Sequence, residues 1–411
     1  MKKRNELILF FLIIFSVFII SGTSSKSLET SAYVIAIGID SGDTNTLKLT
    51  FQFASPHGGS KSGNSSSSSQ SDTSSIATVE CSSIDSGISL MNSYMTKKVN
   101  LSHCKVIVLS ESVSYNGISE YICTLMNHIE VRPDCNIIIS RCMASDFLSN
   151  SKPMLETVSA RYYELILTSS EYVGYSKAVF LSDFYSNILD TSQQAIAILG
   201  DINSGSTPPI RNETFAYDID SGFLAGESPI QNETILETLG LAVFNGDRLV
   251  GELTSIDTIC HLITTNNLNK ATISIPSSFL KSSTMSLYIS SNKKTKNSIR
   301  FLNGLPYITS KIYVSANILS SDDNIDYQNK DNLKLIEDNL KTYLTSKIYE
   351  YLYKTAKVYK SDINGFGKLA KRHYLTLKDW QNSDWLSNYQ NAFFNVDVSV
   401  NVQSSYLFNK T

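Results

Sequence analysis

The chain has 411 residues, of which 42% are hydrophobic and 18% are charged, and its formal net charge is -3. That length supports two or three domains with real hydrophobic cores, and the charged fraction is below the usual ~25%. The slightly negative balance excludes the broad basic surface by which proteins bind nucleic acid.

A basic and then apolar segment opens the sequence. Lys2, Lys3 and Arg4 precede an almost wholly apolar run from Leu7 to Ile20. This run is short for the ~30 Å hydrocarbon core of a membrane, so residues 1–23 are predicted to be an export signal. An uncleaved segment that acts as a membrane anchor is the alternative, and in both cases the rest of the chain works outside the cytoplasm.

The six cysteines are too few and too scattered to form a disulfide framework. Cys104, Cys135 and Cys142 lie in or beside apolar runs that are typical of strands, and Cys123 lies in a helical pattern. We therefore favour small buried thiols over disulfide bridges. No Cys or His spacing typical of a metal site is present, so no metal is predicted.

The first folded stretch predicts a β-hairpin, with strands from Tyr33 to Ile39 and from Leu47 to Ala54 on either side of a turn-rich segment. Residues 57–75 are rich in Gly and Ser, a composition that cannot repay the entropy of ordering, so they are expected to form a flexible loop. Deleting this loop should affect the core little.

Helical and strand patterns alternate beyond this loop, in the order that crossover connections produce in an α/β layer with parallel strands. Helical spacing of apolar residues occurs at Ile84–Met95, Ile118–Ile129, Pro153–Thr168 and Val179–Leu189, and strand-like runs occur at Cys104–Leu109 and Cys135–Ser140.

The loop-rich stretch from Asn203 to Glu233 is the best candidate for a domain boundary, since it contains Pro208-Pro209. We expect an N-terminal α/β domain at residues 24–205 and a C-terminal α+β domain at residues 206–411. A further division of the second domain into two subdomains is an alternative.

The second half is predicted to consist mainly of strands in an antiparallel or mixed sheet. The strand patterns lie at Leu241–Phe244, Ala271–Ile275, Met285–Ile289 and Ile312–Ile318. Asn245-Gly246 follows the first of them and predicts a type I′ hairpin turn, in which Gly246 has a positive φ.

A long helix and a final strand complete the chain. Apolar residues recur every three or four positions from Leu333 to Tyr359, which predicts a helix between Asn329 and Ser361 that covers the sheet, ended by a left-handed Gly365. Alternating valines from Val396 to Val402 predict the last strand. The fold class is α/β and α+β: a multi-domain chain of mixed β-sheets packed with helices.

The usual catalytic motifs for acyl transfer, phosphate binding, zinc hydrolysis and dinucleotide binding are missing from the sequence. Gly58–Gly63 looks like a phosphate loop but lies in low-complexity sequence. His103-Cys104 and Cys260-His261 each offer a thiol and an imidazole, but neighbours on a strand point to opposite faces. In each pair, we therefore expect one side chain to face the core and the other to face solvent.

Three further residues were weighed as site candidates. Asp362 is interpreted as a helix-end or turn residue in preference to a general acid. Trp380 and Trp385 are interpreted as core anchors in preference to an aromatic ligand platform. No catalytic, cofactor-binding or metal-ligating residue is therefore assigned.

Four blocks occur in a fixed order across nearly the whole chain: Ile35–Asp40, Ser102–Val108, Gly240–Gly251 and Ser361–Lys368, the last followed by Trp380. Together they resemble the landmarks of the Ger(x)C family, the C subunits of nutrient germinant receptors in spore-forming bacteria. The blocks Gly240–Gly251 and Asp362–Gly367 are the most specific.

The resemblance implies a non-catalytic lipoprotein of three α/β-type domains on the outer face of the spore inner membrane, beside two integral-membrane subunits, A and B. The sequence departs from the family at its anchor, because Thr23 stands where a lipoprotein signal has cysteine, and the first cysteine is Cys81. No lipidation residue is therefore assigned. Attachment must come from the uncleaved apolar segment or from the partner subunits.

The favoured function is that of an exported, non-catalytic receptor subunit, required for nutrient-triggered germination by docking with the A and B subunits at the membrane surface. The alternative is an exported solute-binding protein or an enzyme with an unrecognised site. No cofactor and no nucleic-acid partner is predicted, and the sequence does not tell whether the germinant itself is bound.

Overall fold

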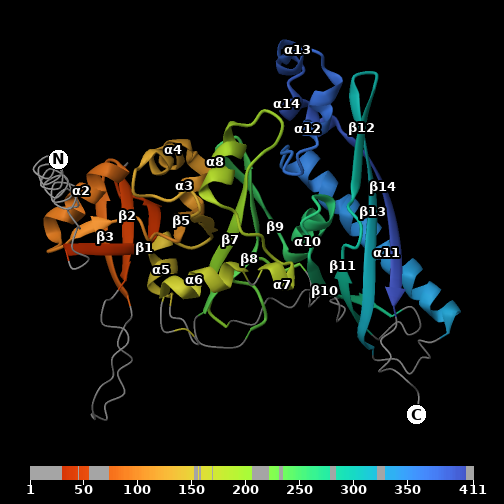
Figure 1. The fold of residues 1–411 in the computed structure, drawn as a ribbon, viewed down its shortest axis with the longest axis horizontal. Coiled ribbons are helices and arrows are strands. Elements are labelled where there is room, and N and C mark those ends of the chain that lie inside the picture. Colours follow the sequence, from red (N-terminus) through yellow and green to blue (C-terminus); the bar gives the residue numbers. More distant parts are fainter. Residues whose placement is uncertain are drawn as a thin grey trace, which may run out of the picture.

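The computed structural model describes residues 30–44, 46–54, 74–151, 156, 159–168, 170–205, 222–230, 235–277, 284–321 and 329–403. Several predicted features lie outside the described residues: the segment 1–23, which includes Thr23; the Ser/Gly-rich loop up to residue 73, which includes Gly58–Gly63; and Pro208-Pro209. The described elements form two β-sheets (Figure 1). One hydrophobic core cluster includes residues of both sheets, and a second cluster lies on the other face of the first sheet.

The first sheet has nine strands. They are β1 (Ser31–Ser41), β2 (Leu47–Ala54), β3 (Ser74–Cys81), β4 (Lys98–Asn100), β5 (Val106–Ser110), β6 (Asn136–Ser140), β7 (Ile196–Asn203), β8 (Ile235–Asn245) and β9 (Arg248–Leu253). Their order is β3-β2-β1-β5-β6-β7-β8-β9, with β4 beside β1. Strands β1, β5, β6 and β7 are parallel, and antiparallel hairpins flank them on both sides. The predicted hairpin and the predicted parallel layer are confirmed, although Ser74 and Ser75 belong to β3 and not to the predicted loop.

Helices cover both faces of the parallel centre, which makes its strands apolar throughout. Ile107 and Leu109 of β5 pack on one face, and Val106 and Val108 on the other. The first face is covered by α2 (Ile84–Tyr94), α3 (Glu111–Asn116), α4 (Ser119–Asn127) and α8 (Leu181–Leu189), and the second by α5 (Ala144–Ser149) and α6 (Ser159–Thr168).

The first sheet continues past the boundary expected between residues 205 and 206. Strand β8 pairs with β7 from Ile196↔Val243 to Asn203↔Ile235, and β9 then pairs with β8. The hairpin of β8 and β9 therefore belongs to the sheet of the N-terminal half, because β8 pairs with the edge of β7 that faces away from β6. The domain division at 205/206 itself stays a prediction.

The β8–β9 hairpin is confirmed, but its predicted type I′ turn is wrong. Asn245 pairs with Arg248, so the two turn residues are Gly246 and Asp247. Gly246 has a φ of 61°, whereas Asp247 is not among the residues with positive φ. A positive φ at the first turn residue alone is typical of a type II′ turn.

The second sheet is packed on one face by a long helix. Its strands are β10 (Lys270–Pro276), β11 (Thr284–Ser290), β12 (Lys296–Leu302), β13 (Leu305–Ser321) and β14 (Phe393–Gln403), in the order β10-β11-β13-β12 with β14 parallel to β13. Helix α11 (Lys330–Tyr353) lies along β14 and buries Ile336, Leu340, Leu344 and Ile348. The predicted sheet, covering helix and final strand are confirmed.

The end of the long helix differs from the prediction. A π-helical turn, η2 (Lys354–Val358), extends α11, and the left-handed residue that follows it is Lys360, with a φ of 51°. Gly365 is also left-handed, with a φ of 71°, but it lies in the next turn, so its assignment as the helix end is wrong. The wider π turn shifts the apolar stripe, which leaves Val358 69% exposed.

Helix α10 (Ser255–Thr264) lies between the two sheets and contacts β8, β9, β13 and α11. Cys260 and His261 are both buried, so the expectation of one solvated side is wrong for this pair. The reason is that the pair lies on a helix enclosed on every side, and not on a half-exposed strand. Among the described residues, no helix is both long and apolar enough to cross a membrane.

Candidate functional site

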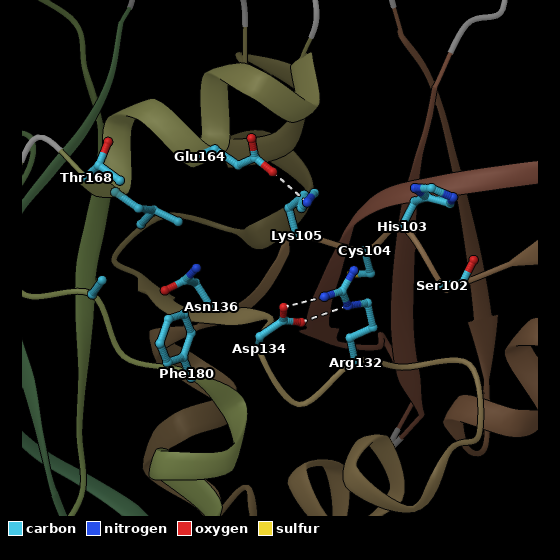
Figure 2. Close-up of a pocket in the computed structure, with 12 residues that line it drawn as sticks. Ser102, His103, Cys104, Lys105, Arg132, Asp134, Asn136, Glu164, Thr168 and Phe180 are labelled. Carbon is cyan, nitrogen blue, oxygen red and sulfur yellow. Dashed lines mark hydrogen bonds and ion pairs between the residues drawn. The ribbon is translucent and has the colours of Figure 1, made fainter.

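A pocket of about 450 Å³ opens at the amino-terminal ends of β5 and β6 (Figure 2). Lys105 Nζ lies 2.5 Å from Glu164 Oε1 of α6. Arg132 donates through Nε and Nη2 to the two carboxylate oxygens of Asp134, at 3.0 and 2.7 Å. Asn136 also lines the pocket, and its Oδ1 is buried without a hydrogen-bond partner among the described residues. The pocket therefore presents charges of both signs, while this oxygen is closed off from solvent.

The two ion pairs of the pocket are weak enough to be rearranged by a ligand. Their side chains are between 35% and 59% exposed, and ion pairs in such positions contribute about 0–1 kcal/mol. The remaining lining includes the apolar side chains of Leu167, Ala178 and Phe180.

His103 and Cys104 lie at the rim of this pocket but in different environments. The ring of His103 is exposed and packs edge-on against Tyr33, with centroids 4.8 Å apart. Cys104 is buried, and the thiol of Cys135 donates to its carbonyl oxygen at 2.9 Å. The neighbouring Cys135 thiol and burial both raise the pKa of Cys104, so the thiol stays neutral and a poor nucleophile. The expected buried and solvated sides are confirmed here, although the pair lies in the turn before β5.

Cys260 and His261 are part of a buried polar group between the sheets. His261 Nδ1 lies 2.8 Å from the hydroxyl oxygen of Tyr351, which donates to Asn364 Oδ1 at 3.0 Å. His261 therefore carries its proton on Nδ1, and its buried Nε2 has no hydrogen-bond partner within the part of the chain that the structure describes. Burial lowers the pKa of His261 well below its usual value and raises that of Cys260, so both side chains are neutral. All six cysteines are free thiols.

Asp362 is fully buried in the turn before α12 (Gly367–Ala370), and its carboxylate binds amides at the start of that helix. Its carboxylate accepts hydrogen bonds from Phe366 N at 3.1 Å, Gly367 N at 2.7 Å and Trp385 Nε1 at 2.8 Å. Burial raises the pKa of Asp362 to about 6 because these three donors only partly replace water. The prediction of a turn or helix-end residue is confirmed.

The two tryptophans anchor the segment that follows. Trp380 lies in α13 (Leu377–Asn382) and Trp385 begins α14 (Trp385–Asn388), and their rings stack with centroids 6.3 Å apart. Both are buried, and Trp380 Nε1 donates to Thr191 Oγ1 at 3.0 Å. Core anchoring is therefore confirmed for both.

The Ser361–Lys368 block joins the two halves of the molecule. Ser361 Oγ donates to the carbonyl oxygen of Phe244 in β8 at 2.6 Å, and Gln194 N donates to the carbonyl oxygen of Asp362 at 2.9 Å. Lys368 Nζ donates to Gln193 Oε1 at 2.6 Å. These bonds tie the turn after α11 to the first sheet.

A charged cluster at the carboxyl ends of β6 and β7 was missed by sequence reasoning. Arg141 Nη1 lies 3.1 Å from Glu227 Oε1 and 3.9 Å from Asp201 Oδ2, and Arg141 Nε lies 3.3 Å from Glu252 Oε1. Burial raises the pKa of both Asp201 and Glu252. Its members come from separate stretches of the chain, so no local motif signals it. The described residues contain no group of His, Cys, Asp and Glu side chains able to hold a metal ion.

Comparison with known proteins assigns both halves of the chain. A model of the spore germination protein N-terminal domain matches residues 24–201, and a model described as spore germination B3/GerAC-like, C-terminal, matches residues 239–406. A solved structure, "Crystal Structure of the GerBC protein", is 18% identical, with a TM-score of 0.48 over 89% of this chain and 96% of that chain. Comparison with curated proteins gave no match. From the two successive family matches, the chain belongs to the Ger(x)C family of spore germination proteins, the C subunits of germinant receptors.

Proposed function

We propose that this chain is the non-catalytic, extracytoplasmic subunit of a spore nutrient germinant receptor. In this role it docks with the membrane-embedded A and B subunits on the outer face of the spore inner membrane and is required for nutrient-triggered germination. The observation that carries the proposal is the pair of family matches, which follow each other in order over residues 24–201 and 239–406.

The packing of the described residues supports a docking role. Helix α10 contacts both sheets, and hydrogen bonds of the Ser361–Lys368 block tie the turn after α11 to the first sheet. The thiol and imidazole groups weighed as catalytic candidates do not form an activated pair: Cys104 and Cys260 are buried neutral thiols, and His261 is a buried neutral imidazole. These features favour a rigid scaffold over an enzyme.

Membrane attachment is proposed to come from residues 1–23 retained as an anchor, or from the partner subunits, since Thr23 offers no thiol for lipidation. Fractionation of cells that produce the full chain tests this point. We expect the chain in the membrane fraction with its N-terminal segment intact, or released only when the A and B subunits are absent. A processed chain found in the soluble fraction beside both subunits would contradict the proposal.

The receptor role is tested by deleting the gene in a strain that has no other nutrient receptor. Spores should then fail to germinate with nutrients but respond normally to a trigger that bypasses receptors, and the intact gene should restore the response. A tagged chain should also co-purify the A and B subunits from detergent-solubilised spore membranes. Normal nutrient germination of the deletion strain would refute the proposal.

Capture of a small charged solute is a second candidate function, favoured by the two half-exposed ion pairs that line the pocket, Lys105–Glu164 and Arg132–Asp134. A solute that pairs with these charges should raise the unfolding temperature of the protein, and Lys105→Met with Arg132→Met should abolish the rise caused by a carboxylate. No stabilisation by a panel of ammonium-bearing, carboxylate-bearing and neutral polar solutes would remove this candidate.

A further inference from the structure

An apolar tip projects from one end of the second sheet. The β12–β13 hairpin turns at Asn303-Gly304, and the flanking Leu302 and Leu305 are 54% and 36% exposed. Beside this hairpin, Leu375 is 100% exposed and Leu377 is 62% exposed. We call Leu302, Leu305, Leu375 and Leu377 the apical tip. Figure 1 shows α13 and the end of the β12–β13 hairpin at the same end of the molecule.

Ring contacts hold the two parts of the apical tip together. The ring of Phe301 lies 5.7 Å from that of His373 and 6.1 Å from that of Tyr374, between centroids. Tyr374 also packs against Trp380, at 5.6 Å. The hairpin and the segment before α13 are thus one packed unit and not two separate loops.

The leucine at position 375 is held outward by its neighbours. Tyr374 before it is fixed by its aromatic contacts, and Thr376 after it caps α13 by accepting a hydrogen bond from Asp379 N at 3.1 Å. With both neighbours fixed, Leu375 cannot turn inward without breaking the cap or the ring packing. Leu375 thus stands exposed together with Leu302, Leu305 and Leu377, and an apolar patch gathered at one place marks an interaction site.

Basic side chains surround the apical tip. Lys371 and Arg372 precede Leu375, and Lys378 follows Leu377; all three are exposed. Within the part of the chain that the structure describes, none of the three forms an ion pair. The nearby carboxylate of Asp379 accepts a hydrogen bond from Thr376 Oγ1 at 2.6 Å. Three cations against the two carboxylates of Asp379 and Asp384 leave residues 371–384 with a net charge of +1 (3 − 2), whereas the whole chain has a net charge of -3.

This arrangement matches an anionic lipid surface better than a protein surface. A stable protein interface buries about 800 Å² on each partner around a closely packed apolar centre. The apical tip instead offers a few leucines on two turns, with cations beside them. Leucines that enter the boundary between headgroups and acyl chains, with Lys and Arg left among anionic headgroups, are typical of interfacial membrane binding.

We propose that the apical tip inserts into the surface of an anionic lipid bilayer, with Leu375 and Leu377 in the acyl boundary and Lys371, Arg372 and Lys378 at the headgroups. The inference deepens the proposed function, on which it rests, by naming the face that meets the lipid. It gives the chain a second membrane contact, independent of residues 1–23, which fixes the orientation of the second sheet relative to the bilayer.

Hydrogen exchange of the full chain tests the proposal. The chain is incubated with phosphatidylcholine vesicles, with and without phosphatidylglycerol, and amide exchange is followed along the sequence. Amides of residues 371–378 should exchange about tenfold more slowly on the anionic vesicles than on the neutral ones. Unchanged exchange of this segment on anionic vesicles would overturn the proposal, even if residues 1–23 bind the vesicles.

Variants separate the apolar contribution from the electrostatic one. Leu375→Ala with Leu377→Ala should remove most of the protection, because both side chains then bury far less apolar surface in the acyl boundary. Lys371→Glu, Arg372→Glu and Lys378→Glu should each weaken the anionic preference about fivefold. The control is Lys334→Glu with Leu335→Ala, a lysine and a half-exposed leucine on α11, which should leave the protection of residues 371–378 intact.

A photoreactive side chain at position 375 distinguishes lipid from protein in native membranes. Crosslinks to lipid are expected, whereas crosslinks to a membrane subunit alone would replace the lipid proposal with a protein interface.

If the receptor proposal fails, spores germinate normally without the gene while the tip is still protected on anionic vesicles. If the lipid proposal fails, germination depends on the gene but the tip is unprotected.

Discussion

The carboxylate of Asp362 and the indole of Trp385 form a buried hydrogen bond, with Trp385 Nε1 donating to Asp362 Oδ2 at 2.8 Å. The same carboxylate accepts the amide protons of Phe366 and Gly367, and the backbone carbonyl of Asp362 accepts Gln194 N from the first sheet. One side chain therefore organises the turn after α11, fixes the tryptophan segment and stands where the two sheets meet. This explains why an aspartate without a cationic partner is kept in the core.

Removing this carboxylate should destabilise the whole molecule. Asp362→Ala leaves three buried N–H groups without an acceptor, and each such group costs about 1–3 kcal/mol. We expect a loss of about 3 kcal/mol or more in the free energy of unfolding, measured by urea denaturation. Asp331→Asn, in the exposed first turn of α11, is the control and should change stability by about 0.5 kcal/mol or less. A loss below about 1 kcal/mol for Asp362→Ala would contradict the assignment.

The pH dependence of stability should carry the signature of Asp362. Its pKa is raised from 3.8 to about 6 in the folded state, so between these values the folded chain holds a proton that the unfolded chain has released. The stabilisation is complete below the unfolded pKa and is lost as the pH rises through about 6. The unfolding free energy of the wild type minus that of Asp362→Asn should therefore fall by about 2–3 kcal/mol between about pH 4 and about pH 7. A constant difference would show that burial does not shift this carboxyl group.

His261 should make the free energy of unfolding change with pH in the opposite direction. Burial lowers its pKa, so as the pH falls below about 6.5 the unfolded chain binds a proton that the folded chain does not, and stability falls. In His261→Asn, which places an amide near the position of Nδ1, this loss at acid pH should be absent. Tyr351→Phe removes the partner hydroxyl but no titrating group in this range, and should lower stability by about 1–2 kcal/mol at every pH. Parallel pH profiles for the wild type and His261→Asn would refute the buried neutral imidazole.

Two glycines of the β8–β9 hairpin should respond to substitution for different reasons. No atom lies within 4 Å of a Cβ added at Gly246, so Gly246→Val should lose about 1–3 kcal/mol through its positive φ alone. At Gly251 an added Cβ would overlap the ring of Tyr359, so Gly251→Ala should displace Tyr359 from its hydrogen bond to the carbonyl oxygen of Glu252. Unchanged thermal unfolding of Gly246→Val would reject the turn.

Periodicity predicted the elements well because burial on one or both faces leaves a regular apolar pattern. The stripe of α11 and the valines of β14 were found in this way, and so were the parallel strands. Departures arose where a local signal competed with tertiary structure. The π turn at the end of α11 points Val358 outward, although its spacing predicted a buried position. Asn245 pairs with Arg248 in the β-sheet, although it was predicted to lie in the hairpin turn. The type I′ turn instead occurs at Asn303-Gly304, where both residues have positive φ.

The candidate sites were predicted less completely because they depend on distant pairings. Asp362 and the tryptophans could be interpreted as structural from sequence, but their hydrogen bond needs two turns brought together by the core. The exposure of Leu375 had no sequence signal, since a leucine beside Tyr374 gives the same local pattern whether it points inward or outward.

The cluster around Arg141 provides the last prediction. Its guanidinium lies among three carboxylates from β7, β9 and the segment before β8, and burial already raises the pKa of Asp201 and Glu252. Arg141→Met should raise these pKa values further, so the variant should lose about 2–4 kcal/mol near pH 7 and less near pH 5, where the carboxylates are closer to neutral. Arg132→Met breaks a pair whose side chains are 59% and 55% exposed and should cost about 1 kcal/mol or less at both pH values. Urea denaturation of both variants measures this contrast. If Arg141→Met lost the same free energy at both pH values, the arginine would act through packing and not through its charge.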